Sequence, residues 1–205
     1  MAACDADRSP AGALTSAGLR DAAIIAVLDA CGLRRAELTG LQYADYDRAR
    51  RMLTVTGKGD KQRRIPVNSF AARRVEAWLA RRGTHRGPLF PRLARGGTVR
   101  TAPDGRPWQM NPQAVRDILT KRAEQAATTA VRPHDLRRTF ISNLLPQADA
   151  IMTARLAGHA SPSTTLRYDV RPDEEARDAV ERLRVPAIAP LLPDTPADRR
   201  PPTAP

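Results

Sequence analysis

The strongest constraint on the fold is a change of periodicity over residues 43–67. Within this stretch, short runs rich in β-branched and aromatic residues predict strands at 43–46, 52–56 and 64–67. A glycine-punctuated turn at 57–60 separates the last two strands and predicts a hairpin. The segments on both sides carry apolar residues at helical spacing instead. The chain is therefore expected to fold as an α+β domain, mainly α-helical with a small three-stranded antiparallel sheet.

Helices are predicted before and after this sheet. The helix over 16–31 ends at Gly32, because glycine adopts the left-handed backbone that suits a helix terminus, and a short helix follows with Arg34 at its start. Pro112 is favourable at the first position of a later helix. The connection 83–111 is basic and rich in glycine and proline, which predicts a loop. The remaining helices are expected at 34–41, 70–82, 111–127, 135–145, 149–157, 163–168 and 173–184.

The length of 205 residues suits one domain with a hydrophobic core and is too short for two large domains. Residues 1–14 are small and polar, and we expect a short flexible N-terminal segment there. Residues 15–184 form the expected folded domain. Residues 185–205 contain seven prolines and little periodic apolar content, which predicts a disordered tail.

The charge of the chain favours a polyanionic partner. The formal net charge is +12 and the pI is about 11.1, and basic side chains bind phosphates with release of counterions. Nucleic acid is the leading candidate, although coding that enriches arginine would give the same charge. Three of the 34 basic residues are lysines, and two of these, Lys58 and Lys61, fall in the predicted hairpin.

Several other classes of protein are disfavoured by composition. Cys4 and Cys31 form no CxxC pair, and the three histidines lack the spacing of zinc ligands, so neither a disulfide framework nor a metal is expected. No cofactor motif is present. No stretch approaches the roughly 18 apolar residues of a membrane span. A cytoplasmic protein that does not contact the membrane is expected.

Six polar residues stand in ordered local motifs that suit chemistry on a phosphodiester. A metal-free attack on such a bond needs fixed cations, a proton donor and a nucleophile, because the phosphate repels nucleophiles and the alkoxide leaves poorly. The motifs read GLRRAEL, GKGDK, HDLRRT, LAGH and TTLRY along the chain. The six residues are Arg34, Lys58, His134, Arg137, His159 and Tyr168.

Together these motifs resemble the tyrosine recombinase (phage integrase) family over residues 14–184. The resemblance implies the catalytic-domain fold of DNA breaking-rejoining enzymes. It also implies a site-specific recombinase or integrase of a bacterial mobile element. Such an enzyme cleaves and rejoins double-stranded DNA through a 3′-phosphotyrosyl intermediate, without metal or ATP. The implied partners are duplex DNA, on which the protein associates with the nucleoid, and further copies of itself as a dimer or tetramer.

The two arginines and two histidines have roles that fit this chemistry. Arg34 and Arg137 can each present a bidentate fork to the non-bridging phosphate oxygens, as the matching arginines of the family do. His134, three residues before Arg137, is assigned by the resemblance to the active site as proton acceptor or phosphate donor. His159 follows a glycine at a helix end and can donate to the same phosphate. The alternative is that either histidine only caps or packs.

Lys58 and Tyr168 supply the proton donor and the nucleophile. An amine on a hairpin can protonate the departing 5′ oxygen, and Lys61 is the weaker candidate for this role. The alternative is an ordinary basic turn. Tyr168 is the expected nucleophile, since a tyrosyl ester keeps the energy of the broken bond and permits transfer to another strand.

Glu37 and three further arginines adjoin the catalytic positions. Glu37 matches a supporting acid of the family that holds a catalytic arginine or histidine in place, and a solvent-facing helix charge is the alternative. Arg35, Arg138 and Arg167 are interpreted as phosphate contacts or surface charges.

Family members usually carry a core-binding domain before the catalytic one, whereas about fifteen residues precede the first predicted helix here. We therefore expect no core-binding domain in this chain, and a partner that supplies one is a candidate. The runner-up function is a catalytically weak or inactive DNA-binding relic or regulator. Type IB topoisomerase chemistry is a third reading, and the Gly-His-to-Tyr arrangement favours a recombinase over it.

Overall fold

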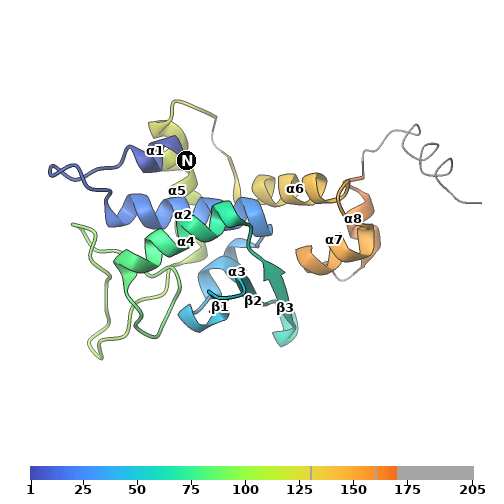
Figure 1. Cartoon of the computed structure of the whole chain (residues 1–205), viewed down its shortest axis with the longest axis horizontal. Helices are drawn as coiled ribbons and strands as arrows, with labels where there is room; N and C mark the ends of the chain where they lie inside the picture. The colour runs from blue at the N-terminus through green and yellow to red at the C-terminus, as the bar shows by residue number, and fades with distance from the viewer. Residues whose placement is uncertain (130, 160, 170–205) are drawn as a thin grey trace, which may run out of the picture. The chain divides into compact units, whose positions relative to one another are not determined.

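Helix α2 (Ser16–Cys31) is the element around which the core is built. Its residues Ala23, Ile24, Val27 and Leu28 are buried almost completely. In the computed structural model, which describes residues 1–129, 131–159 and 161–169, α2 packs lengthwise beside α4 (Ser69–Arg82) (Figure 1). It also contacts α1, α5 and α6, so it is surrounded by neighbours on several sides. This explains why a helix near the start of the folded region is apolar over most of its surface.

The described residues lie within one structural unit, Met1–Val170. The helix expected over 173–184 and the Pro-rich tail expected over 185–205 lie outside them. No helix in the described ranges is long and apolar enough to cross a membrane.

The sheet follows the chain order β1-β2-β3 with antiparallel pairing, and three strands are present in the described part of the chain. The strands are β1 (Tyr46–Asp47), β2 (Met52–Thr56) and β3 (Gln62–Pro66). Leu53 of β2 lies opposite Tyr46 on one side and Ile65 on the other, and all three side chains are buried. The alternation of β2 and β3 thus places one face of the sheet on the core. The expected three-stranded antiparallel sheet is confirmed.

The strand predicted over 43–46 is wrong for most of its length. Residues Tyr43–Asp45 form a 3₁₀ helix, η1, and β1 contains two residues. The Asp45 carboxylate accepts a hydrogen bond from the Gln42 N–H, at 2.7 Å, which closes a tight turn. A side chain that binds its own backbone competes with a sheet ladder, and this local bond decides the conformation.

The predicted helices that fall within the described residues are present with small changes at their ends. Thr15, Asn68, Asn111 and Asp149 each accept a hydrogen bond from a backbone N–H of the following helix, which fixes where these helices begin. Pro112 stands in the first turn of α5, as predicted. The other helices are α3 (Arg35–Gly40), α5 (Pro112–Gln125), α6 (Pro133–Leu144), α7 (Ala150–Ala157) and α8 (Pro162–Leu166).

The N-terminal segment differs from the flexible segment expected from its composition. It contains a short helix, α1 (Ala2–Asp5), whose Cys4 is buried. Asp5 pairs with Arg74 of α4, and Asp7 pairs with Arg122 of α5 at 2.7 Å. The acidic residues of this polar segment are thus partners for arginines of the domain.

A second, smaller apolar cluster joins α6 and α7. It is formed by Ile141, Leu145 and Ala157 and is flanked by Phe140, Ala150 and Tyr168. This region contacts the end of α2 at Gly32, against which Phe140 packs. The Gly32 backbone is left-handed, with φ of 58°, and a Cβ there would lie 2.3 Å from the Phe140 ring. Glycine is therefore required at the end of α2, both for the turn and for the close approach of α6.

Candidate active site

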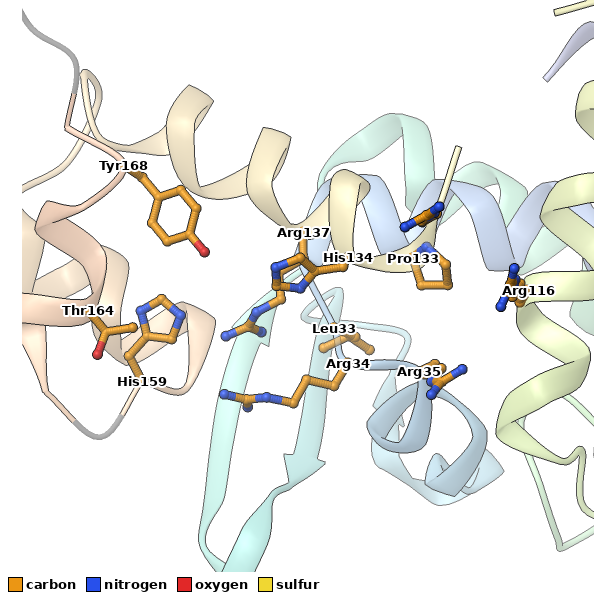
Figure 2. A pocket seen from close by; sticks show the side chains of 11 residues that line it. Leu33, Arg34, Arg35, Arg116, Pro133, His134, Arg137, His159, Thr164 and Tyr168 are labelled. Carbon is orange, nitrogen blue, oxygen red and sulfur yellow. The ribbon is translucent and has the colours of Figure 1, made fainter. Parts of the chain in front are cut away.

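Five of the six residues expected to be catalytic line one hollow of about 650 Å³. These are Arg34, His134, Arg137, His159 and Tyr168, shown with their neighbours in Figure 2. Five arginines line the hollow, and no carboxylate is among the described residues that do so. Such a surface attracts anions. The other lining residues are Leu33, Arg35, Arg116, Arg132, Pro133 and Thr164.

Arg137 is the most buried of the charged residues in this hollow. Its residue surface is 4% exposed, and its Nη1 donates to the backbone oxygen of Gly32 at 2.7 Å. Its Nη2 is buried and has no hydrogen-bond partner among the described residues. Burial and the nearby Arg34 lower the pKa of Arg137 to about 10, so it stays protonated at neutral pH. An unpaired buried donor is costly, and an anion in the hollow would satisfy it.

Arg34 is held differently, by partners on two elements. It is the N-cap residue of α3, and its side chain is 47% exposed. Its Nη1 donates to Glu37 at 2.9 Å, and its Nη2 donates to the backbone oxygen of Gly158 at 3.2 Å. The guanidinium groups of Arg34 and Arg137 both extend toward the side of the hollow where His159 and Tyr168 lie (Figure 2).

Glu37 is buried, with a side chain that is 5% exposed, and it accepts from two arginines. Besides Arg34, it binds Nη1 and Nη2 of Arg63 at 3.0 and 2.9 Å. Burial opposes ionisation of Glu37, but the hydrogen bonds from Arg63 and from the Arg34 backbone hold its pKa below the usual range. The solvent-facing alternative for Glu37 does not hold. The carboxylate orients Arg34, which agrees with the supporting position expected for it.

Arg63 is a residue that the sequence analysis missed. It lies on β3, and its Nε donates to the backbone oxygen of Leu156 near the end of α7 at 3.0 Å. It therefore links the sheet, α3 and α7 through side-chain bonds. The signal that could have identified it is strand alternation, because Arg63 lies two residues before buried Ile65 and points to the same face of β3.

His159 follows the left-handed residue Gly158, which ends α7 with φ of 70°. Its Nδ1 is 2.8 Å from the hydroxyl of Thr165, a buried residue that the sequence analysis did not single out. Its ring is stacked near Tyr168, with centroids 6.4 Å apart and an interplanar angle of 22°. Burial and the positive charge of Arg137 lower the pKa of His159 to about 4, so it is neutral at pH 7. A neutral imidazole has one N–H to donate.

Tyr168 follows α8 and is half-buried. One side of its ring packs on the small apolar cluster of α6 and α7. In Figure 2 the hydroxyl is directed toward the part of the hollow where the guanidinium of Arg137 lies. The phenol thus has an apolar support on one side, and its polar end faces the hollow.

His134 stands in the first turn of α6 and is exposed at the rim of the hollow. Arg116 of α5 and Arg132 also line it, and the sequence analysis missed both. Nothing in their local sequence marks them, since α5 reaches this place through its packing against α3 and α6. Arg138 and Arg167 are exposed and are not among the described residues that line the hollow.

Lys58 is the one expected catalytic residue that the structure does not bring to the hollow. It lies in the turn η2 (Lys58–Asp60), and both it and Lys61 are exposed. The turn contains left-handed backbone at Gly59 and Asp60, with φ of 73° and 54°. Lys58 therefore lies at the tip of the β2–β3 hairpin.

The chain is similar to known proteins of one family. Residues 1–175 match the model of the phage integrase family. The tyrosine recombinase XerC of Myxococcus xanthus is 40% identical over 156 residues, which cover 75% of this chain and 51% of that protein. The chain therefore spans about half the length of the curated relatives it matches.

Solved structures of recombinases share the fold, including those of XerA and XerH. The XerA recombinase aligns with a TM-score of 0.62 and 24% identity, over 82% of this chain and 60% of that one. The XerH site-specific recombinase bound to its difH substrate aligns with a TM-score of 0.64 and 19% identity, over 88% and 50%. The family match over residues 1–175 and the similarity to XerC show that this chain is a member of the phage integrase family.

Proposed function

We propose that this chain cleaves and rejoins double-stranded DNA as a site-specific recombinase or integrase. The observation that carries the proposal is the hollow itself. It gathers five arginines, two histidines and a tyrosine, and one of its arginines is buried with a donor that has no partner among the described residues. The relatives that the chain matches are tyrosine recombinases, which supports the same chemistry.

The arginines bind the scissile phosphate in this proposal. Nη2 of Arg137 donates to one non-bridging oxygen, and the exposed guanidinium of Arg34 donates to the other. Both charges stabilise the five-coordinate transition state, in which negative charge on these oxygens increases. His159 adds one neutral donor. Because Gly32 and Glu37 fix the two arginines before DNA binds, little reorganisation is needed during the reaction.

Tyr168 is the proposed nucleophile. Its hydroxyl loses a proton to His134, or to solvent beside it, and the oxygen attacks the phosphorus. The bond between phosphorus and the 5′ oxygen breaks, and Lys58 gives that oxygen a proton once the hairpin approaches the DNA. The product is a 3′-phosphotyrosyl enzyme and a free 5′ hydroxyl. Attack by the 5′ hydroxyl of another strand reverses the step and regenerates the tyrosine.

Several wider properties are part of the proposal. The chain acts on duplex DNA in the cytoplasm and associates with the nucleoid when bound. It self-associates on DNA as a dimer or tetramer, and a partner that supplies a core-binding domain completes the grip on the substrate. Adduct formation and DNA affinity can be measured separately, so a loss of catalysis can be distinguished from a loss of binding.

The test is incubation of the full chain with a nicked, labelled DNA duplex from its own genomic flank. A denaturant-resistant protein–DNA adduct is expected, and Tyr168→Phe abolishes it while DNA affinity stays largely unchanged. The adduct depends on the tyrosine because phenylalanine keeps the ring and its packing but lacks the nucleophilic oxygen. Salt-sensitive binding without an adduct, also after a core-binding domain is added in trans, would favour the DNA-binding relic instead.

A further inference from the structure

The connection between α4 and α5 contains a small rigid structure, which we call the arginine ribbon and define as residues 91–109. Three residues spaced eight positions apart, Arg92, Arg100 and Trp108, are joined by backbone hydrogen bonds in a closed ring. The N–H of Arg92 donates to the oxygen of Trp108, that of Arg100 to Arg92, and that of Trp108 to Arg100, at 2.9, 2.9 and 2.8 Å. Two turns at Gly97 and Gly105 separate these positions. Although the region has the composition of a loop, its three passes of chain are tied together.

These backbone bonds bring two arginine side chains over the ring of one tryptophan. The guanidinium carbon of Arg100 is 4.6 Å from the centre of the Trp108 ring, and that of Arg92 is 5.7 Å from it. All three residues are exposed. Neither arginine forms an ion pair with a carboxylate in the described part of the chain, whereas Arg106 of the same ribbon pairs with Asp104. Two permanent charges are thus held at a fixed place with their N–H edges free.

The ribbon is attached to the core but is separate from the hollow described above. Arg20 of α2 donates to the backbone oxygen of Pro91, and Gln109 donates to that of Thr39, at 3.4 and 3.0 Å. The Arg20 anchor and the contact of Gly97 with Ser16 put the ribbon beside the first turns of α2, and the Gln109 bond ties its end to α3. The hollow lies at the other end of α2, where Arg137 binds Gly32. Sixteen helical residues span about 24 Å.

The chemistry of the ribbon fits phosphate. A guanidinium over an aromatic ring is held by cation–π attraction, and its in-plane N–H groups remain available for a bidentate contact. Side chains fixed in advance lose less conformational entropy when they bind. The indole face is already occupied by arginines, which disfavours stacking of an unpaired base. About 24 Å also equals roughly seven base pairs of B-DNA, at about 3.4 Å for each.

We propose that the arginine ribbon is a second DNA-contacting surface, which binds the phosphate backbone of duplex DNA through Arg92 and Arg100 at a distance from the active-site hollow. The proposal rests on the proposed function for the identity of the nucleic acid. It goes further by assigning a role to residues that no catalytic step uses. The ribbon adds affinity and grip on the flank of the site without reading its sequence.

The test compares Arg92→Ala/Arg100→Ala with Arg48→Ala/Arg50→Ala in the full chain. The control removes the same charge, but its arginines pair with Glu76 and Asp47. Affinity for a labelled random duplex of about 30 base pairs is measured between about 50 and about 200 mM salt. The ribbon variant should bind on the order of tenfold more weakly, and its salt slope should fall by about 1.8, or about 0.9 for each lost phosphate contact. The control should change neither quantity by a comparable amount.

Thermal unfolding should be unchanged in each variant, which shows that the variants are folded. Equal affinity and slope in the ribbon variant and the control would overturn the proposal. Loss of single-strand binding alone in Trp108→Leu would also overturn it, in favour of a base-stacking site. The Tyr168-dependent adduct at saturating DNA reports on the proposed function separately, since the ribbon variant should still form it.

Discussion

Two regions of the molecule contribute residues to the hollow, and they differ in how much apolar core stabilises each of them. The region around α2, α4 and the sheet has a large continuous apolar core. The α6–α8 region has a cluster of three buried apolar residues with a few half-buried neighbours. The larger core carries Arg34 and Glu37, whereas the smaller cluster supports Tyr168. Tyr168, the proposed nucleophile, thus belongs to the region with less apolar burial of its own.

Polar bonds between the two regions compensate for this difference. Arg137 binds Gly32, Arg34 binds Gly158, and Arg63 binds Leu156, each through a backbone carbonyl. Directional bonds to carbonyls fix the positions of α6 and α7 more narrowly than apolar contact does. The arginines that we propose as phosphate ligands, Arg34 and Arg137, thus also form bonds that position the segments around Tyr168. Changes at these bonds should therefore affect catalysis more than stability.

The largest effect is expected for Arg137→Lys. Lysine keeps the charge but cannot present a planar fork, so it cannot bind Gly32 and a phosphate oxygen with the geometry of arginine. We expect adduct formation to slow by about 10² to 10³. The measurement is the rate of the phosphotyrosyl adduct on a nicked duplex.

The matched control is Arg138→Lys, at the exposed neighbour outside the hollow. A rate close to that of the unaltered protein in Arg137→Lys would show that charge alone suffices there. It would also contradict the proposal that Arg137 binds Gly32 and a phosphate oxygen at the same time.

An intermediate effect is expected for Gly158→Ala. A Cβ at this position would lie 2.7 Å from the guanidinium carbon of Arg63, so Arg63 or the end of α7 must move. Displacement of reacting groups by about 1 Å can cost about 10² in rate. We expect adduct formation to fall by about tenfold to a hundredfold.

Gly12→Ala separates this clash from backbone strain. Gly12 has φ of 80°, close to the 70° of Gly158, but a Cβ there would meet nothing within 4 Å. Backbone strain should lower the free energy of unfolding of each variant by about 1 to 2 kcal/mol, measured by urea denaturation, and the clash should add to this loss in Gly158→Ala. Equal adduct rates in the two variants would contradict the alignment role of the bond between Arg63 and Leu156.

The smallest effect concerns pH and His159. Its folded pKa is lowered from 6.5 to about 4 by burial and Arg137, so the unfolded chain binds the proton more readily. This group therefore contributes stability that is complete above about pH 6.5 and is lost as the pH falls toward about 4. Urea unfolding across this window should show a steeper loss of stability in the unaltered protein than in His159→Gln. Parallel curves would mean that His159 is not shielded from protonation.

The sequence predicted much of the fold because local signals and tertiary packing agree there. Capping residues and apolar spacing placed α2, α4, α5, α6 and α7 within a few residues of their observed ends. Local signals competed at Tyr43–Asp45, where an aspartate bound the backbone and replaced a strand with a turn. Beyond the described residues, the predicted helix over 173–184 and the tail remain predictions.

The site was predicted unevenly for a related reason. Arg34, His134, Arg137, His159 and Tyr168 stand in local motifs, and the structure gathers them in one hollow. Arg63 and Arg116 stand in no such motif, and Thr165 lies in the TTLRY motif without being singled out; all three contribute through contacts with residues distant in sequence or across a turn. Lys58 shows the converse, since its motif is plain but its exposed turn does not place it at the hollow.

By itself, the sequence determined the helices, the hairpin, the left-handed turn at Gly32 and the set of chemical groups available, because these depend on neighbours within a few residues. Only the tertiary structure decided which of those groups meet. It buried Glu37 between two arginines and left one donor of Arg137 without a partner among the described residues. It also set two ribbon arginines on one tryptophan. Burial and charge pairing depend on packing between distant segments, and no local pattern records them.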